Sequence, residues 1–303
     1  MPSLRARLVN RILRTTTKSV WRPGLEIAEV RQHTARMEAR FVRGPLYIAT
    51  EPVNLDGIPA TWFGGPEREQ TGTLLYLHGG AWCLHLPKIY ARFAAFLSHL
   101  TGMRVLLPEY RLAPEHPFPA GVDDCFAAYR WLLDHGYRER ALALAGDSAG
   151  GNLSLITLMR ARSALLPMPD CAALLSPAVD LTWSGPSVRY NAELDPMFST
   201  PAMDLLPDVY CPGQDRGNPL LSPLFGSWDG LPPLLFQAGS TEMLLDDSVR
   251  AHDRARQAGV TADIEVYVGL PHVWHMIGWL PEAKHATRQV AEFILQRSVW
   301  RHG

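Results

Sequence analysis

The chain of 303 residues is 47% hydrophobic and carries 29 basic against 30 acidic residues. This length and apolar content allow one large core, and the balanced charge excludes a global field that favours nucleic acid. The scattered cysteines Cys83, Cys125, Cys171 and Cys211 predict buried thiols in a reducing compartment rather than a disulfide framework. We therefore expect a cytoplasmic protein with a single domain over residues 1–303 and no nucleic-acid partner.

The first 22 residues predict an amphipathic basic helix. Leu4, Leu8 and Ile12 recur every four residues, and the segment contains no acid. It has no apolar run of roughly 7–15 residues and no cleavage-like site, so it is neither a signal peptide nor a membrane span. We expect a cap helix whose polar face is basic; docking on an anionic membrane surface is the alternative. The basic residues are Arg5, Arg7, Arg11, Arg14, Lys18 and Arg22.

The middle of the chain alternates between short apolar runs and longer helical runs, which predicts a mostly parallel central sheet with helices on both faces. The strands are expected at about 73–78, 103–108, 141–146, 171–176, 233–239 and 262–268. The helices are expected at about 88–100, 119–136, 149–163, 245–258 and 281–298. The stretch 39–63 predicts two leading edge strands in antiparallel orientation. The fold class is therefore α/β.

The first strand of this alternation runs into a glycine loop, HGGAW at 78–82. Because glycines carry no side chain, the N–H groups of Gly79 and Gly80 can approach a negative charge that develops on a substrate oxygen. We favour a structural role for His78, which would hold the glycine loop through hydrogen bonds. A metal ligand or a free base is the alternative for that histidine.

A second apolar run ends in GDSAGG at 146–151, and a helical stretch without breakers follows. A strand that reverses sharply into a helix requires small residues beside the turn, which Gly146 and Gly150 provide. Such a turn lifts the Ser148 hydroxyl above the sheet, within reach of a base and a carbonyl. The segment therefore predicts a nucleophile elbow, with the N–H of Ala149 as a third oxyanion donor. A glycine-rich turn with an idle serine is the alternative.

The C-terminal strand leads into Gly269-Leu270-Pro271-His272, and His272 is the predicted general base. It follows the serine in the chain order nucleophile, acid, histidine. His275 is the nearest competitor, but it lies further from the strand end. A zinc site built on these two histidines is a weak alternative, because no third ligand stands at a recognisable spacing.

The acid is expected after the strand at 233–239, since a carboxylate there can accept the Nδ1–H of the histidine and fix its tautomer. Glu242 lies closest to the end of that strand. Asp246 and Asp247 fit better as the first residues of the next helix, where negative charge suits the helix dipole. We expect Glu242 rather than Asp246 to be the acid.

Together these blocks resemble the hormone-sensitive lipase family of esterases, also called bacterial family IV, in the α/β-hydrolase superfamily. The oxyanion block 78–82, the nucleophile block 146–151 and the histidine block 269–272 carry the resemblance, and YRLAPEHPFPA at 110–120 adds a fourth. Two positions depart from the family pattern. Ala81 replaces the third glycine of the oxyanion block, and Glu242 stands where the family usually has the aspartate of an Asp-Pro-Leu sequence.

The resemblance implies an α/β-hydrolase fold whose small helical cap comes from about 1–45 and 182–215. The second range carries Trp183, Tyr190, Phe198 and Tyr210, as a lid over an acyl pocket requires, although ordinary packing on the sheet is the alternative. The implied enzyme is a serine carboxylic-ester hydrolase for small-molecule esters.

We expect this enzyme to use a Ser148–Glu242–His272 triad with no metal or organic cofactor, and to prefer short to medium acyl chains. An amidase or peptidase with the same triad remains the first alternative. A ligand receptor on the same scaffold is a second alternative, and the presence of His272 disfavours it. The sequence is also compatible with a homodimer.

Overall fold

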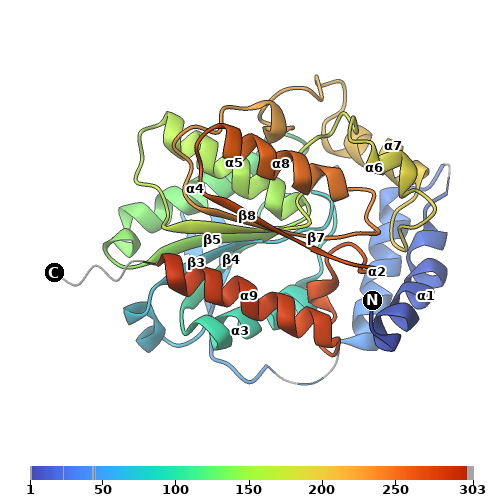
Figure 1. Ribbon diagram of the computed structural model, residues 1–303. Helices are drawn as coiled ribbons and strands as arrows, with labels where there is room; N and C mark the ends of the chain where they lie inside the picture. Colours follow the sequence, from blue (N-terminus) through green and yellow to red (C-terminus); the bar gives the residue numbers. More distant parts are fainter. Residues whose placement is uncertain (1, 23, 43, 45, 299–303) are drawn as a thin grey trace.

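The computed structural model describes residues 2–22, 24–42, 44 and 46–298. In this part of the chain eight strands form one sheet, in the order β1-β2-β4-β3-β5-β6-β7-β8 (Figure 1). The strands are β1 (Thr50–Leu55), β2 (Ile58–Phe63), β3 (Thr73–Leu77), β4 (Arg104–Pro108), β5 (Leu142–Asp147), β6 (Cys171–Leu175), β7 (Leu234–Gly239) and β8 (Ala262–Tyr267). The predicted alternation is confirmed, with strand ends within two residues of the expected bounds.

Neighbouring strands from β4 to β8 pair in parallel, whereas β2 pairs antiparallel with both β1 and β4. The residues of β3, β5 and β6 are all buried, as expected for parallel strands covered on both faces. The expectation of two edge strands within 39–63 is half wrong, because β1 forms the edge and β2 lies between β1 and β4. Residues 39–41 belong to a helix instead.

Helices cover the two faces of the sheet in two layers (Figure 1). On one face lie α3 (Pro87–Thr101) and α9 (Pro281–Arg297), and on the other lie α4 (Ala120–Asp134), α5 (Ala149–Ser163) and α8 (Leu245–Gln257). Side chains alternate between the faces along each strand. In β3, Leu74 and Tyr76 pack in the α3–α9 core, whereas Leu75 and Leu77 pack in the larger core on the other side.

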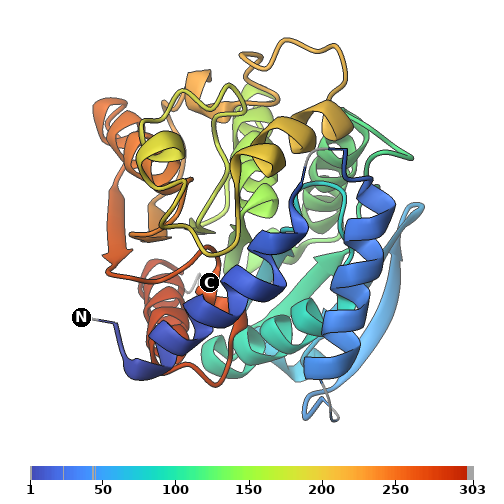
Figure 2. The ribbon, with the colours of Figure 1, turned by 90° about the vertical axis from the view of Figure 1, so that its right-hand side faces the viewer.

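The remaining helices gather where the parallel strands end. They are α1 (Leu4–Thr16), α2 (Ile27–Phe41), α6 (Ser187–Tyr190) and α7 (Thr200–Tyr210). Figure 2 shows α1 and α2 beside the segment that contains α6 and α7, although the two segments are far apart in sequence. Short 3₁₀ turns complete the elements: η1 (Lys18–Val20), η2 (Pro66–Gln70), η3 (Tyr137–Glu139), η4 (Pro223–Phe225) and η5 (Trp274–Met276).

Hydrogen bonds fasten the N-terminal segment to the segment at 182–215. Lys18 Nζ donates to the carbonyl oxygens of Ala192 and Asp195, at 2.5 and 2.9 Å. Trp21 Nε1 donates to the carbonyl oxygen of Met197 at 3.0 Å. Because these acceptors are backbone atoms, the two segments are joined irrespective of the acceptor side chains.

The N-terminal helix α1 packs through a face other than its leucine stripe. Ala6 and Val9 are buried against the loop and helix that follow β8. The stripe itself faces solvent, with Leu4 81%, Leu8 54% and Ile12 42% exposed. The packed face of α1 is therefore the one that carries Ala6 and Val9, and the leucine stripe lies on its outer face. No helix in the described part of the chain is long and apolar enough to cross a membrane.

The four cysteines are free and buried, as predicted. Burial raises the pKa of the Cys83 thiol to about 12, and it does the same for Cys171. A thiol with so high a pKa is not ionised at neutral pH and is therefore a poor nucleophile.

Candidate active site

Ser148 occupies a sharp turn between strand and helix. β5 ends at Asp147 and α5 begins at Ala149, and Ser148 has a φ of 52°. This left-handed backbone is rare for a residue with a side chain and is stored strain. The turn excludes side chains beside it, since a Cβ on Gly146 would meet Gly150 O at 2.4 Å and one on Gly150 would meet Leu77 O at 1.9 Å. The strand and helix can therefore approach only with glycines at these positions.

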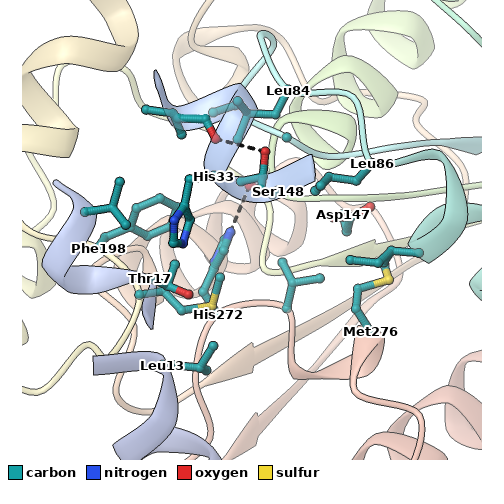
Figure 3. A pocket seen from close by; sticks show the side chains of 18 of the residues that line it. Leu13, Thr17, His33, Leu84, Leu86, Asp147, Ser148, Phe198, His272 and Met276 are labelled. Carbon is teal, nitrogen blue, oxygen red and sulfur yellow. Dashed lines mark hydrogen bonds between the residues drawn. The ribbon is translucent and has the colours of Figure 1, made fainter. Parts of the chain in front are cut away.

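Three buried side chains form a continuous hydrogen-bonded chain at this turn. His272 Nε2 lies 2.8 Å from Ser148 Oγ, and His272 Nδ1 lies 2.8 Å from Glu242 Oε2. The carboxylate can only accept from the ring while ionised, which places the ring proton on Nδ1 and leaves Nε2 to accept the Ser148 hydroxyl. Figure 3 shows His272 pointing at Ser148 from below. The three residues follow β5, β7 and β8, whose carboxyl ends lie at one edge of the sheet.

Burial and charge act in opposite directions on this group. Burial lowers the pKa of His272, but the hydrogen bond and charge of Glu242, with the charges of Asp195 and Asp147, outweigh it and leave this pKa raised. Burial raises the pKa of Glu242, and its hydrogen bonds from His272, Gly239 and Ser176 oppose that rise. The arrangement stabilises an imidazolium beside a carboxylate, which a serine nucleophile requires.

Glu242 is held by a residue that sequence reasoning missed. Ser176 Oγ donates to Glu242 Oε1 at 2.8 Å, and the N–H of Gly239 donates to the same oxygen. Ser176 directly follows β6, the strand between those that carry the serine and the acid. Its place at the carboxyl end of a central strand was the available signal. Together the two donors leave Oε2 directed at His272.

The competing acids serve another part of the molecule. Asp246 accepts the N–H of Ser187 at 2.7 Å and the hydroxyl of Tyr190 at 3.1 Å. Asp247 accepts the N–H groups of Val179 and Asp180, at 2.7 and 3.0 Å. Both carboxylates therefore anchor the chain that follows β6, and the structure joins His272 to Glu242 instead.

The second histidine of the C-terminal block lies apart from the serine. His275 Nε2 bonds Gln237 Oε1 at 2.8 Å. Burial lowers the pKa of His275 to about 3, so the ring is neutral at ordinary pH. Both ring nitrogens of His272 are engaged by Ser148 and Glu242, so this pair of histidines does not converge on a common point. The described residues contain no group of three or more His, Cys, Asp or Glu side chains placed to hold a metal ion.

The glycine loop differs from expectation at one residue. The N–H of Gly79 donates to Asp147 Oδ1 at 3.0 Å. This N–H is engaged and cannot serve as a free donor in this conformation, so the structure contradicts the role expected for Gly79. Gly80 and Ala81 line the cavity beside Ser148 instead, with φ values of 113° and 52°. The missed signal was Asp147 itself, an acid beside the elbow serine.

His78 has the surroundings expected of a structural residue. Its Nδ1 donates to the carbonyl oxygen of Gly79 at 2.7 Å, and its ring stacks on Tyr110 with centroids 4.3 Å apart. Burial lowers the pKa of His78 to about 4, so the ring is neutral. A neutral, stacked ring fixes the entry to the glycine loop.

An apolar cavity of about 220 Å³ opens onto Ser148 and His272 (Figure 3). Its walls come from several separate parts of the chain, including the segment after β8 with Met276 and Ile277. The N-terminal segment contributes Leu13, Val20, Trp21 and Val30, the segment at 182–215 contributes Met197 and Phe198, and the loop after the glycines contributes Leu84 and Leu86. The site therefore places a serine hydroxyl and a hydrogen-bonded imidazole at an apolar cavity of modest size.

Comparison with known proteins places this geometry among enzymes. Residues 74–276 match the α/β-hydrolase fold family. An acetyl-hydrolase of Streptomyces hygroscopicus is 36% identical over 284 residues, covering 89% of this chain and 94% of the relative. An esterase of Acinetobacter venetianus is 36% identical over 248 residues, covering 81% and 82%.

Solved structures agree over almost the whole chain. The crystal structure of an esterase from the bacterial hormone-sensitive lipase family superposes with a TM-score of 0.90 at 36% identity, covering 98% of this chain and 99% of that one. EstE5, in a crystal soaked with p-nitrophenyl butyrate, superposes with a TM-score of 0.89 at 36% identity, covering 97% and 99%. This chain belongs to the hormone-sensitive lipase family of the α/β-hydrolase superfamily and is a serine ester hydrolase.

Proposed function

We propose that this enzyme cleaves carboxylic esters with Ser148 as nucleophile, His272 as general base and Glu242 as the acid that orients the base. The hydrogen-bonded chain from Ser148 Oγ through the imidazole to Glu242 Oε2, with two contacts of 2.8 Å, carries this proposal. It ends at an apolar cavity, as an acyl-transfer site needs.

The proton transfers follow from these contacts. His272 Nε2 takes the hydroxyl proton as Ser148 Oγ attacks the ester carbonyl, and the resulting imidazolium is stabilised by Glu242. The imidazolium then protonates the leaving alcohol, which leaves an acyl group on Ser148. A water molecule loses a proton to His272 and attacks the acyl group. The imidazolium then returns that proton to Ser148 Oγ as the acid leaves, which restores the starting state.

We propose that the N–H groups of Gly80, Ala81 and Ala149 stabilise the oxyanion. Gly80 and Ala81 line the cavity at the serine, and Ala149 is the first residue of α5, where a helix N–H has no acceptor within the helix. Removal of one such donor costs about 10²–10³ in kcat in a serine protease. Asp147 supports this site, because its carboxylate accepts the N–H of Gly79, the residue before Gly80.

The cavity favours short to medium acyl chains. Its volume of about 220 Å³ is below the roughly 300–1,000 Å³ of pockets that hold drug-sized ligands. The walls are mostly apolar, and Trp21 and Phe198 close one side, with ring centroids 6.2 Å apart. An amidase activity with the same triad is the second candidate, and comparing a p-nitrophenyl ester with the matching p-nitroanilide separates the two.

The test of the proposed function is Ser148→Ala on p-nitrophenyl butyrate. We expect kcat to fall on the order of 10⁶-fold with an unchanged circular dichroism spectrum, because the other two residues cannot act without the nucleophile. Full activity of this variant would end the assignment.

We also propose one domain over residues 1–303 with a cap built from about 1–45 and 182–215. The bonds from Lys18 and Trp21 to the second segment support it, as does the contribution of both segments to the cavity wall. Residues 1, 23, 43, 45 and 299–303 of these ranges lie outside the described residues.

The outer face of α1 supports a membrane partner. Its exposed stripe of Leu4, Leu8 and Ile12 is flanked by the exposed arginines Arg5 and Arg11. Arg7 is exposed as well, and α1 contains no acidic residue. We infer that this face docks on an anionic lipid surface, where the leucines enter the apolar boundary and the arginines meet the headgroups.

A homodimer is the other occupant of this face, and charge disfavours it. Two copies of α1 packed stripe to stripe would bring two sets of arginines together, at a cost that anionic lipid avoids. We propose a cytoplasmic location for the enzyme, and the four buried, free cysteines support a reducing compartment.

A further inference from the structure

Asp195 joins the cap to the loop that carries the proposed acid. It lies between α6 and α7, and its side chain is fully buried. Its Oδ1 accepts the N–H groups of Met197 and Phe198, at 2.7 and 3.0 Å, and its Oδ2 accepts the N–H of Met243 at 2.8 Å. Three backbone donors compensate the burial of one carboxylate, so its two oxygens fix two different loops at once.

The first of these loops places an aromatic ring on the histidine. Phe198 meets His272 edge to face, with ring centroids 4.9 Å apart and planes at 61°. Figure 3 shows Phe198 beside His272 on the side of the cavity away from Asp147. Aromatic contacts of this geometry are favourable beyond the burial of apolar area. The ring therefore limits how far the imidazole can turn away from Ser148.

The second loop places the acid. Met243 is the residue after Glu242, so the bond from its N–H to Asp195 fixes the backbone on the C-terminal side of the acid. Asn191 Nδ2 donates to the carbonyl oxygen of Glu242 at 2.7 Å and to that of Ser240 at 3.2 Å. The segment 191–195 thus holds the main chain of the acid, while Ser176 and Gly239 hold its side chain.

We propose that Asp195 is a positioning residue for ester hydrolysis, which fixes His272 through Phe198 and through Glu242 and adds a fixed negative charge that favours the imidazolium. This inference rests on the proposed function. It gives the cap a part in the chemistry, because the wall of the cavity and the acid loop share one carboxylate.

The charges around His272 determine how the loss of Asp195 changes the pH dependence of the enzyme. Glu242, Asp195 and Asp147 each raise the pKa of His272, against the effect of burial. His275 lies on the same loop and is neutral, and the ammonium of Lys18 bonds the carbonyl oxygen of Asp195. From α2, His33 lines the same cavity. Loss of the Asp195 charge removes one of three negative contributions and therefore lowers the pKa of His272.

The test is the pH profile of kcat/KM on dissolved p-nitrophenyl butyrate for Asp195→Asn and Asp195→Glu. Asparagine has the same shape, but its amide group must face the N–H of Met243, so two donors meet and the acid loop shifts. We expect a fall in plateau kcat on the order of 10²-fold, with KM changed less, and an acid limb at lower pH than in the wild type. Asp195→Glu keeps the negative charge, so we expect the acid limb of its profile to stay at the wild-type pH while its plateau kcat falls.

The matched control is Asp246→Asn, which removes a carboxylate that joins α8 to the cap, through Ser187 and Tyr190. It is expected to keep the wild-type limb and plateau. A wild-type profile in folded Asp195→Asn overturns the inference while ester hydrolysis stands. Loss of folding in both Asp195 variants also overturns it, since the carboxylate then serves stability alone. A wild-type enzyme inactive on all esters would instead reject the proposed function.

Discussion

The N–H of Gly79 donates to Oδ1 of Asp147, the residue before the elbow serine, over a sequence separation of 68 residues. The same carboxylate accepts the hydroxyl groups of Tyr76 at 2.7 Å and Tyr90 at 3.0 Å. Burial raises the pKa of Asp147, and these three donors oppose that rise. The carboxylate therefore ties the glycine loop to the nucleophile turn, so that the two parts of the proposed oxyanion site keep a fixed separation.

Gly79→Ala tests this tie. A Cβ on Gly79 would lie 2.3 Å from Asp147 Oδ2, so the loop must move and carry Gly80 and Ala81 with it. We expect kcat to fall on the order of 10²-fold with a small change in KM, because the oxyanion donors act mainly in the transition state. Gly278→Ala is the control, since nothing lies within 4 Å of its Cβ position. Equal activity of the two variants would show that the loop position is unimportant.

The choice of acid can be decided by two amide substitutions. Glu242→Gln removes the carboxylate that accepts from His272 Nδ1, and we expect a loss of about 10⁴ in kcat. Asp246→Asn is expected to lower kcat little, because this side chain caps α6 and does not reach the histidine. Steady-state kinetics on p-nitrophenyl butyrate measure both. A large loss of kcat in Asp246→Asn, with nearly normal kcat in Glu242→Gln, would reverse the assignment.

Acyl-chain preference follows from the cavity. We expect kcat/KM to peak at short to medium p-nitrophenyl esters and to decline as the acyl chain outgrows about 220 Å³. The enzyme should show saturation kinetics on dissolved esters, with no jump in rate when the substrate exceeds its solubility. A steep rise at that point, or a preference for emulsified long-chain triacylglycerol, would identify a true lipase.

Membrane docking is tested by sedimentation with vesicles. We expect the wild type to bind vesicles of phosphatidylcholine with phosphatidylglycerol more tightly than phosphatidylcholine alone, and to release with rising salt. Leu8→Glu with Ile12→Glu should abolish binding while activity on dissolved esters persists. Leu165→Glu is the control, since Leu165 is 92% exposed but lies after α5. Binding unaffected by the α1 changes, or a wild-type dimer that they dissociate, would reject the proposal.

Local patterns predicted most of the framework. Strand and helix positions follow from hydrophobic periodicity, which each segment carries within itself, and the observed bounds agree within two residues. The identity of the edge was less accessible. β2 lies inside the sheet because β4, more than 40 residues later in the chain, pairs with the side of β2 that β1 leaves open. No local pattern in 58–63 predicts that pairing.

The sequence by itself determined the order of the blocks and the glycines of the elbow, because chain order and missing side chains are properties of the sequence alone. Tertiary structure decided which donors and carboxylates meet. The N–H of Gly79 donates to Asp147, which lies at the end of a different strand. Glu242 accepts from His272, whereas Asp246 accepts the N–H of Ser187 in α6. Only the packing of α1 could expose Leu4 and Leu8, since a helix with two apolar faces does not specify which one is buried.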